Sequence, residues 1–287
     1  MVFDKISRSW TLAGECWDIL MEDPALLIFP LMSALAIVLI LASFAAPIWT
    51  VYHHHQAALA DGSTTHTAKI LWYAGTYVFY VISYSIAMFF NSALIAVALR
   101  RLDGEPASVQ EGLQTAFSNL PAILGYALIA ATVGTMLRAI EERVGIVGRI
   151  VTAIVGAAWT LATAMTLPVL VVEGAGPVEA ISRSLDLLQR NWGENLIGNG
   201  GISLGIAVIA IPLFAIAWCF MMFATSTKAV GTIVLAAIVL VVTVVGLSLV
   251  SATLHAIYTA ALYRFATGNQ DNGGIRQELL AEAFRQK

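Results

Sequence analysis

Long apolar runs that contain almost no charged residue limit what this chain can fold into. A helix of about 20 mainly apolar residues crosses a hydrocarbon core roughly 30 Å thick. Stretches that meet this requirement are residues 25–48, 70–99, 121–139, 146–172, 196–223 and 229–262. Because a segment in lipid must satisfy its own backbone hydrogen bonds, they predict an all-α integral membrane protein with about six transmembrane helices. The third run is short, and a re-entrant or interfacial segment is the alternative there.

Composition agrees with a membrane location and excludes several classes of protein. Of 287 residues, 59% are hydrophobic and only 11% are charged, against a usual charged share of about 25%. A net charge of -3 without a basic block argues against a nucleic-acid partner. Cys16 and Cys219 lie far apart, so the sequence predicts neither a disulfide framework nor a zinc site. The first apolar run follows acidic residues and is too long for a signal peptide, so we expect it to remain as a span.

Lysine and arginine residues are distributed unevenly between the two sides of a six-span topology. One side carries five of them: Lys69, Arg138, Arg143, Arg149 and Lys228. The other side carries ten: Lys5, Arg8, Arg100, Arg101, Arg183, Arg190, Arg264, Arg276, Arg285 and Lys287. Basic residues in short loops favour the cytoplasm. The bias therefore predicts that both termini are cytoplasmic.

A short amphipathic pattern recurs before the runs, and two of its copies share the letters ISRS. Apolar residues follow at steps of three and four, as on one face of a helix. They are Ile6, Trp10, Ala13 and Trp17; Val109, Leu113, Ala116 or Phe117, and Leu120; and Ile181, Leu185, Leu188 and Trp192. We therefore expect one membrane domain, 1–268, of three pseudo-repeats, 3–99, 106–172 and 177–262. Each comprises an amphipathic helix and a transmembrane hairpin, and 269–287 form a cytoplasmic tail.

The three short helices have two possible locations, and the sequence does not choose between them. They could lie in the membrane interface, where indole rings are favoured. The candidate interfacial residues are Trp10, Trp17, Leu113, Phe117, Leu185 and Trp192. They could instead pack beneath the bundle as a cytoplasmic cap.

Two stretches carry a family resemblance. Residues 89–151, beginning FFNSALIAVALRRLDGEP, and residues 167–185, LPVLVVEGAGPVEAISRSL, resemble a bacterial and archaeal family of polytopic membrane proteins known only as a domain of unknown function. The start PALLIFPLMSALA fits as well, so the resemblance extends to about Gly268. More remotely, the repeated units are similar to the membrane domains of some glycerophosphodiester phosphodiesterases. The resemblance implies a prokaryotic inner (plasma) membrane location and carries over no activity.

Residues suited to chemistry are scarce in the apolar runs. Asn91 and His255 are the main polar exceptions apart from hydroxyl side chains, and helix–helix hydrogen bonding is the favoured role for both. Motifs for phosphate binding, zinc hydrolysis or a nucleophilic serine do not occur. Gly201 and Gly205, with Gly198 nearby, have the spacing of a close helix contact, either within the bundle or with a second subunit.

Two polar groups lie opposite the short helices. Histidines 53–55 and His66 occupy what we expect to be a flexible external loop, where solvent exposure is favoured over a metal site. Arg138, Glu141, Glu142 and Arg143 can form weak pairs within a helix. They are either a solvated helix end or the first candidate for docking a partner.

The sequence thus predicts a non-enzymatic scaffold or accessory subunit without a cofactor. Its expected partners are membrane lipids and either another protein or a second copy. The alternative is a permease or lipid-handling protein, and an enzyme ranks third.

Overall fold

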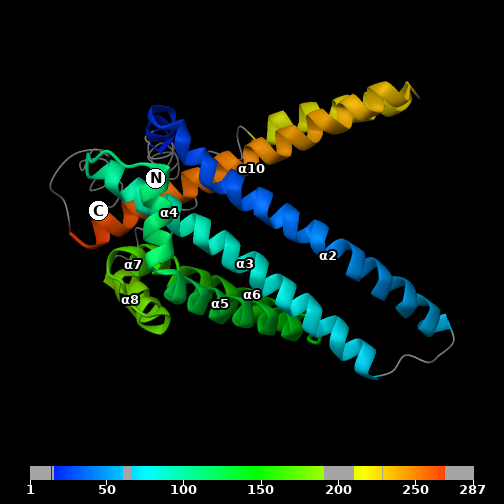
Figure 1. Cartoon of the computed structure of the whole chain (residues 1–287), viewed down its shortest axis with the longest axis horizontal. Coiled ribbons are helices and arrows are strands. Elements are labelled where there is room, and N and C mark those ends of the chain that lie inside the picture. Colours follow the sequence, from blue (N-terminus) through cyan, green and yellow to red (C-terminus); the bar gives the residue numbers. More distant parts are fainter. Residues whose placement is uncertain (1–13, 15, 61–65, 191–209, 228, 269–287) are drawn as a thin grey trace. The chain divides into compact units, whose positions relative to one another are not determined.

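The computed structural model describes residues 14, 16–60, 66–190, 210–227 and 229–268, and every regular element in this part is helical. Figure 1 shows the elements in order. They are η1 (Pro24–Leu27), α2 (Ile28–Ala60), α3 (His66–Leu102), α4 (Val109–Ser118), α5 (Leu120–Glu141), α6 (Ile146–Ala162), α7 (Thr166–Val172), α8 (Pro177–Arg190) and α10 (Val230–Ala266). Residues 16–22 and Ala210–Ser226 are also helical. The prediction of an all-α membrane protein is confirmed.

Five segments of the described chain are long and apolar enough to cross a membrane: Pro24–Phe44, Tyr73–Leu102, Leu120–Glu141, Gly148–Val172 and Val230–Ala266. They correspond to five of the predicted runs. The third run forms α5, whose 22 residues give a length of about 33 Å, enough for a complete span. Of the predicted span 196–223, residues 196–209 lie outside the described residues and Ala210–Ser226 forms a shorter apolar helix.

The predicted flexible loop between the first two spans is wrong in its extent. Helix α2 continues to Ala60 and α3 begins at His66, so histidines 53–55 and His66 are all helical. The segment 50–60 contains neither glycine nor proline. A helix already formed in the apolar run therefore extends through it, because each added residue gains a hydrogen bond without a new nucleus.

The fourth span is interrupted, which the apolar pattern did not predict. Helix α6 ends at Ala162 and α7 begins at Thr166. Pro168 explains the interruption, because it has no N–H to donate to the carbonyl of Ala164 and its ring clashes with that carbonyl. The backbone of Thr163–Met165 turns instead, with the Thr166 N–H donating to the Thr163 carbonyl at 3.1 Å.

The chain divides into two compact units. The first comprises Met1–Ile28, Val97–Val109 and Asp186–Lys287, and the second comprises Phe29–Ala96 and Gln110–Leu185. The predicted single domain and its pseudo-repeat boundaries remain predictions. In the second unit α5 packs against α6 and α7. Gly125 of α5 leaves room for the first residue of α8, because a Cβ on Gly125 would lie 2.9 Å from Cγ of Pro177.

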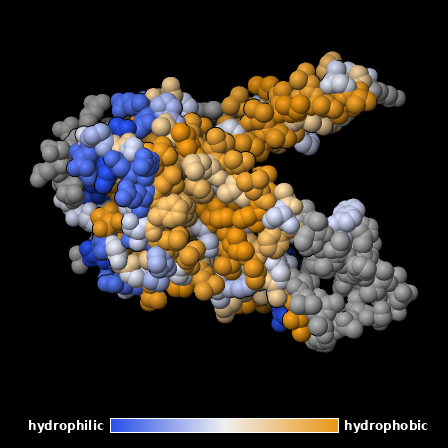
Figure 2. Space-filling view, in the orientation of Figure 1, coloured by the Kyte–Doolittle hydropathy of each residue, from blue (hydrophilic) through white to orange (hydrophobic). Residues whose placement is uncertain are grey.

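In the first unit, burial is concentrated near the C-terminal end of α10, which packs against η1. Leu254, Ile257 and Ala260 are buried there, whereas Val230, Val241 and Val242 near the other end are exposed. Three small residues, Ala217, Ala224 and Ala236, are buried in the segment formed by Ala210–Ser226 and the first part of α10. Figure 2 shows the apolar surface of this segment at the upper right. Such a surface is suited to contact with lipid.

Candidate functional site

Charged side chains of the first unit gather where α3 and α10 end, and we call Asp23, Arg101, Asp103 and Arg264 the clasp. Its local frame is the turn after α3, in which the Glu105 N–H donates to the Arg100 carbonyl at 2.9 Å and the Gly104 N–H to the Arg101 carbonyl at 3.0 Å. This is a Schellman motif, which needs a left-handed residue. Gly104 supplies it with φ of 77°. The chain can therefore end α3 abruptly and present Asp103 at its cap.

The first pair of the clasp joins the end of α3 to the start of the first span. Arg101 Nη2 lies 2.9 Å from Asp23 Oδ2, and it also donates to the carbonyl of Ala107 at 2.9 Å. Asp23 in turn accepts from the Ala25 N–H at 3.3 Å and so caps η1. One carboxylate thus serves both a salt bridge and a helix cap.

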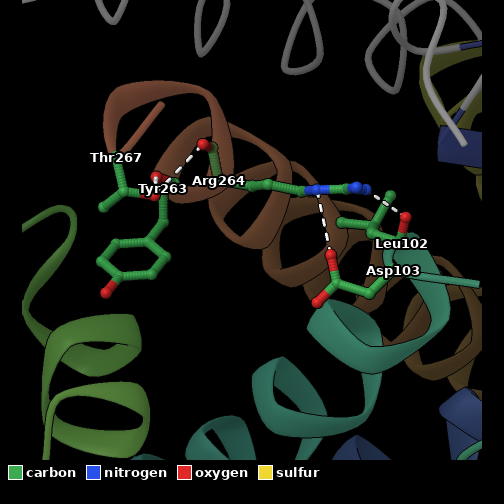
Figure 3. Close-up of polar contacts among 5 residues, drawn as sticks. All are labelled: Leu102, Asp103, Tyr263, Arg264 and Thr267. Carbon is green, nitrogen blue, oxygen red and sulfur yellow. Dashed lines mark hydrogen bonds and ion pairs between the residues drawn. The ribbon is translucent and has the colours of Figure 1, made fainter. Parts of the chain in front are cut away.

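The second pair contains the most buried charged side chain of the clasp, and Figure 3 shows this pair. Arg264 Nε lies 3.1 Å from Asp103 Oδ1, and the Arg264 guanidinium also donates to the carbonyl of Leu102. The Arg264 side chain is only 12% exposed, whereas that of Asp103 is 40% exposed. Leu102 is the last residue of α3, and its carbonyl is one of those left without an intrahelical partner. Arg264 therefore completes the end of another helix.

The clasp has no net charge, because its two arginines face two aspartates. Each arginine also donates to a backbone carbonyl. This bond uses guanidinium N–H groups that would have no acceptor if the carboxylate were the only partner. Such an arrangement holds segments together and offers no free acid, base or nucleophile.

A second polar site lies in the second unit, at the interruption of the fourth span. The Met165 N–H donates to Oγ of Ser184 at 3.0 Å, and both residues are buried. Nearby, an ion pair holds one turn of α8: Arg183 Nε lies 3.3 Å from Glu173 Oε2. Both side chains are about one-third exposed. Ser184 thus supplies the acceptor that the interrupted helix lacks at Met165.

Neutral hydroxyl groups connect the spans of this unit. Tyr77 Oη on α3 lies 2.8 Å from Thr132 Oγ1 on α5. Thr132 donates its own proton to the carbonyl of Leu128 at 2.7 Å, so Tyr77 is the donor between the helices. This bond joins two successive spans without a charge.

Comparison with protein families gives one result. The model of a family of unknown function, DUF6159, matches residues 70–274, which is more than half of the 287 residues. The chain belongs to this family. No curated protein matches it. The match covers Arg101, Asp103 and Arg264 of the clasp and the whole of the second polar site, whereas Asp23 precedes it.

The predicted site residues stay predictions, and the structure gives the exposure of those that it describes. Trp10, Trp192, Gly198, Gly201 and Gly205 lie outside the described residues. Trp17, Phe117 and Leu185 are exposed, and Leu113 is half-buried. Among the described residues there is no group of three or more histidine, cysteine or acidic side chains that could hold a metal.

The charged residues at the end of α5 do not form the intrahelical pairs that their spacing allows. Arg138, Glu141, Glu142 and Arg143 are all exposed, and the structure of this part of the chain contains no ion pair among them. Asn91 and His255 are half-buried. In the described structure neither side chain has a hydrogen-bond partner on another helix.

Sequence reasoning missed the clasp and Ser184. Arg101 and Arg264 were counted only for topology, although local signals were available. An Asp-Gly pair follows the basic end of the second run, and Arg264 precedes Gly268 by four residues. Both patterns are typical of helix C-termini. Their pairing joins residues 161 positions apart (264 − 103 = 161), which periodicity does not reveal.

Proposed function

We propose that this protein is a non-enzymatic scaffold or accessory subunit of a complex in the prokaryotic inner (plasma) membrane. The clasp is the observation that supports the proposal. Asp23, Arg101, Asp103 and Arg264 bind one another and backbone carbonyls, so their charges serve to fix chain segments. A scaffold that holds other subunits of a complex in place needs helix ends that are fixed in this way, and it needs no reactive side chain.

The proposed orientation places both termini in the cytoplasm, from the ten-to-five distribution of basic residues. It assigns the clasp to the cytoplasmic side and the end of α5 to the opposite side. A cysteine at Glu142 should then react with an impermeant maleimide added to intact cells, whereas one at Glu105 should react only after permeabilisation. Both residues are exposed. The reverse pattern would overturn the orientation.

The proposed partners are membrane lipids together with another protein or a second copy of this chain. The exposed group Arg138, Glu141, Glu142 and Arg143 is the candidate surface for the protein partner. Charged groups at the rim of an interface act mainly on the rate and specificity of association. Because none of these four pairs with another of the group, their charges are free to meet a complementary surface.

Native mass spectrometry of the protein released gently from its own membranes tests this function. We expect a second protein in fixed stoichiometry, and we expect the double variant Arg138→Gln/Arg143→Gln to lose most of it. Arg149→Gln is the matched control, because Arg149 is an exposed arginine on the next helix. A chain that is released alone under every mild condition would contradict the scaffold proposal.

A permease or lipid-handling role is the second candidate, and the interrupted fourth span favours it. Discontinuous membrane helices form substrate sites in several transporter folds. The hydroxyl of Thr166, which begins α7, is fully buried and has no hydrogen-bond partner within the described structure. If this candidate is correct, Pro168→Ala should change the lipid or solute retained in native mass spectrometry while protein partners are unaffected.

A further inference from the structure

The three short amphipathic helices share one arrangement of buried, apolar and polar sides. In residues 16–22, α4 and α8, the buried residues include a pair four positions apart: Cys16 and Leu20, Gly112 and Ala116, and Ala180 and Ser184. Positions four apart lie on one face of a helix. We call this face of each helix the inner row. In α8 the buried side continues through Leu187 and Leu188, so each helix rests on protein along one side.

A second line lies one residue further along the sequence, about 100° around each helix. Met21, Phe117 and Leu185 follow the second residue of each buried pair and are 61%, 62% and 37% exposed. We call this face of each helix the outer row. Trp17 and Val178 extend it and are also exposed. Large apolar side chains thus point away from the protein at the same place in all three helices.

The third side of each helix is polar. Asp18, Gln114 and Ser182 occupy equivalent positions, two residues after the first member of each inner row, and all three are exposed. The order around the helix is therefore the same in each case: a buried row, an exposed apolar row and an exposed polar row. Wide apolar arcs next to polar ones are typical of helices that lie in a membrane interface.

The outer row of α4 continues onto a span, which identifies what covers it. The ring of Phe117 meets that of Phe89 edge to face, with ring centroids 4.8 Å apart. Phe89 belongs to the candidate span Tyr73–Leu102. Phe89 is half-buried, and because the outward-facing surface of a span contacts acyl chains, we expect the exposed face of Phe117 to border the same hydrocarbon.

Sequence position places another outer row equally close to a span. Only Asp23 separates residues 16–22 from the candidate span that begins at Pro24, and only Asn119 separates α4 from α5. A row of exposed apolar side chains so near the first turn of a span lies at the boundary between headgroups and acyl chains.

We infer that each short helix binds the lipid leaflet through its outer row while its inner row binds the protein's own bundle. The two locations expected from the sequence, a cap beneath the bundle and the membrane interface, then correspond to two faces of the same helix. The inference goes beyond the proposed function, which names membrane lipids as partners but assigns no surface that binds them.

Spin labels at matched positions test this inference in the full chain reconstituted in vesicles of phosphatidylethanolamine and phosphatidylglycerol. Cys219→Ala removes the exposed native thiol, and Cys16 is buried and stays. Met21→Cys, Phe117→Cys and Leu185→Cys report on the outer row. Asp18→Cys, Gln114→Cys and Ser182→Cys report on the polar row. Electron paramagnetic resonance then compares relaxation by oxygen, which concentrates in hydrocarbon, with relaxation by a water-soluble nickel chelate.

We expect the oxygen-to-nickel accessibility ratio to be severalfold higher at each outer-row site than at its polar-row partner. Equal ratios within the pairs would place the outer row in water and overturn the inference. Outer-row labels inaccessible to both reagents would show a protein partner there and would also overturn it. All six positions are exposed, and of their side chains Phe117 is the one described here as packing on another helix, through its ring contact with Phe89. Size-exclusion chromatography checks that each variant remains folded.

Discussion

The two units of this protein differ in the side-chain bonds that join one membrane-spanning segment to another. In the first unit the clasp pairs full charges at helix ends, where headgroups and water can solvate what the pairs leave uncovered. In the second unit, the bonds between spans come from neutral hydroxyls such as Tyr77 to Thr132. A charge at the centre of a bilayer is costly, whereas a hydroxyl can share a carbonyl of its own helix. Depth in the membrane thus decides which kind of bond a position can use.

The largest expected effect comes from removing the most buried charge of the clasp. Arg264→Met leaves Asp103 and the carbonyl of Leu102 without their partner, and bonds to charged groups are worth about 1.5–3 kcal/mol. We expect a loss of about 2 kcal/mol in the free energy of unfolding. Unfolding titrations in mixed micelles would measure it. Arg264→Met/Asp103→Leu should recover part of the loss, and full additivity would show that the pair does not interact.

Ser184→Ala tests a neutral bond that satisfies a buried backbone group. The Met165 N–H would lose its acceptor, and leaving such a donor unpaired costs about 1–3 kcal/mol. We expect a loss near the lower end of this range, about 1 kcal/mol, because Ala introduces no strain. Ser182→Ala on the exposed side of α8 is the control. Equal melting temperatures for the two variants would contradict the assigned role of Ser184.

Tyr77→Phe removes only the hydroxyl that joins α3 to α5. Bonds of this kind within membranes average about 0.6 kcal/mol, and we expect a loss of that size. Tyr73→Phe is a suitable control, because Tyr73 is an exposed residue of the same helix. A loss as large as that of Arg264→Met would show that neutral and charged bonds do not differ as proposed.

Glu173→Gln should have the smallest effect. Both partners of the pair with Arg183 are about one-third exposed, and exposed ion pairs contribute about 0.2–1 kcal/mol. We expect less than about 0.5 kcal/mol, decreasing further as salt is added. Thermal melting at low and high ionic strength would measure this. A loss that does not respond to salt would mean that the pair is shielded from solvent.

Apolar length and composition were sufficient to predict most of the fold. The five helices that are long and apolar enough to cross a membrane follow from the runs alone, because a helix is the only open structure that satisfies its backbone in lipid. The ends of α2 and α3 could not be predicted from hydropathy, since their extensions past the apolar runs include polar residues such as histidines 53–55 and Lys69. The interruption before α7 was predictable in principle from Pro168, whose missing N–H is a local property.

The candidate sites were less predictable, because they depend on tertiary contacts. Asp103 and Arg264 lie on different helices, and their signals are helix-end signals that many helices carry. Ser184 looked like an ordinary polar position of an amphipathic helix. Its role becomes visible only when a hydrogen-bond partner is sought for each backbone N–H and carbonyl group at the interruption of the fourth span. Periodicity identified the faces of the short helices but not which part of each apolar face is buried.

The lengths of the spans have a consequence for hydrophobic mismatch. Helices α2 and α3 have 33 and 37 residues, or about 50 and 55 Å at 1.5 Å per residue. Even at a tilt of about 40°, a 50 Å helix rises about 38 Å and exceeds a hydrocarbon core of roughly 30 Å. Helix α5, with 22 residues, has almost no excess. The turns of α2 and α3 beyond their apolar runs therefore extend past the hydrocarbon, and a thicker bilayer would have to thin around both α5 and the equally short apolar segment Pro24–Phe44, which has 21 residues.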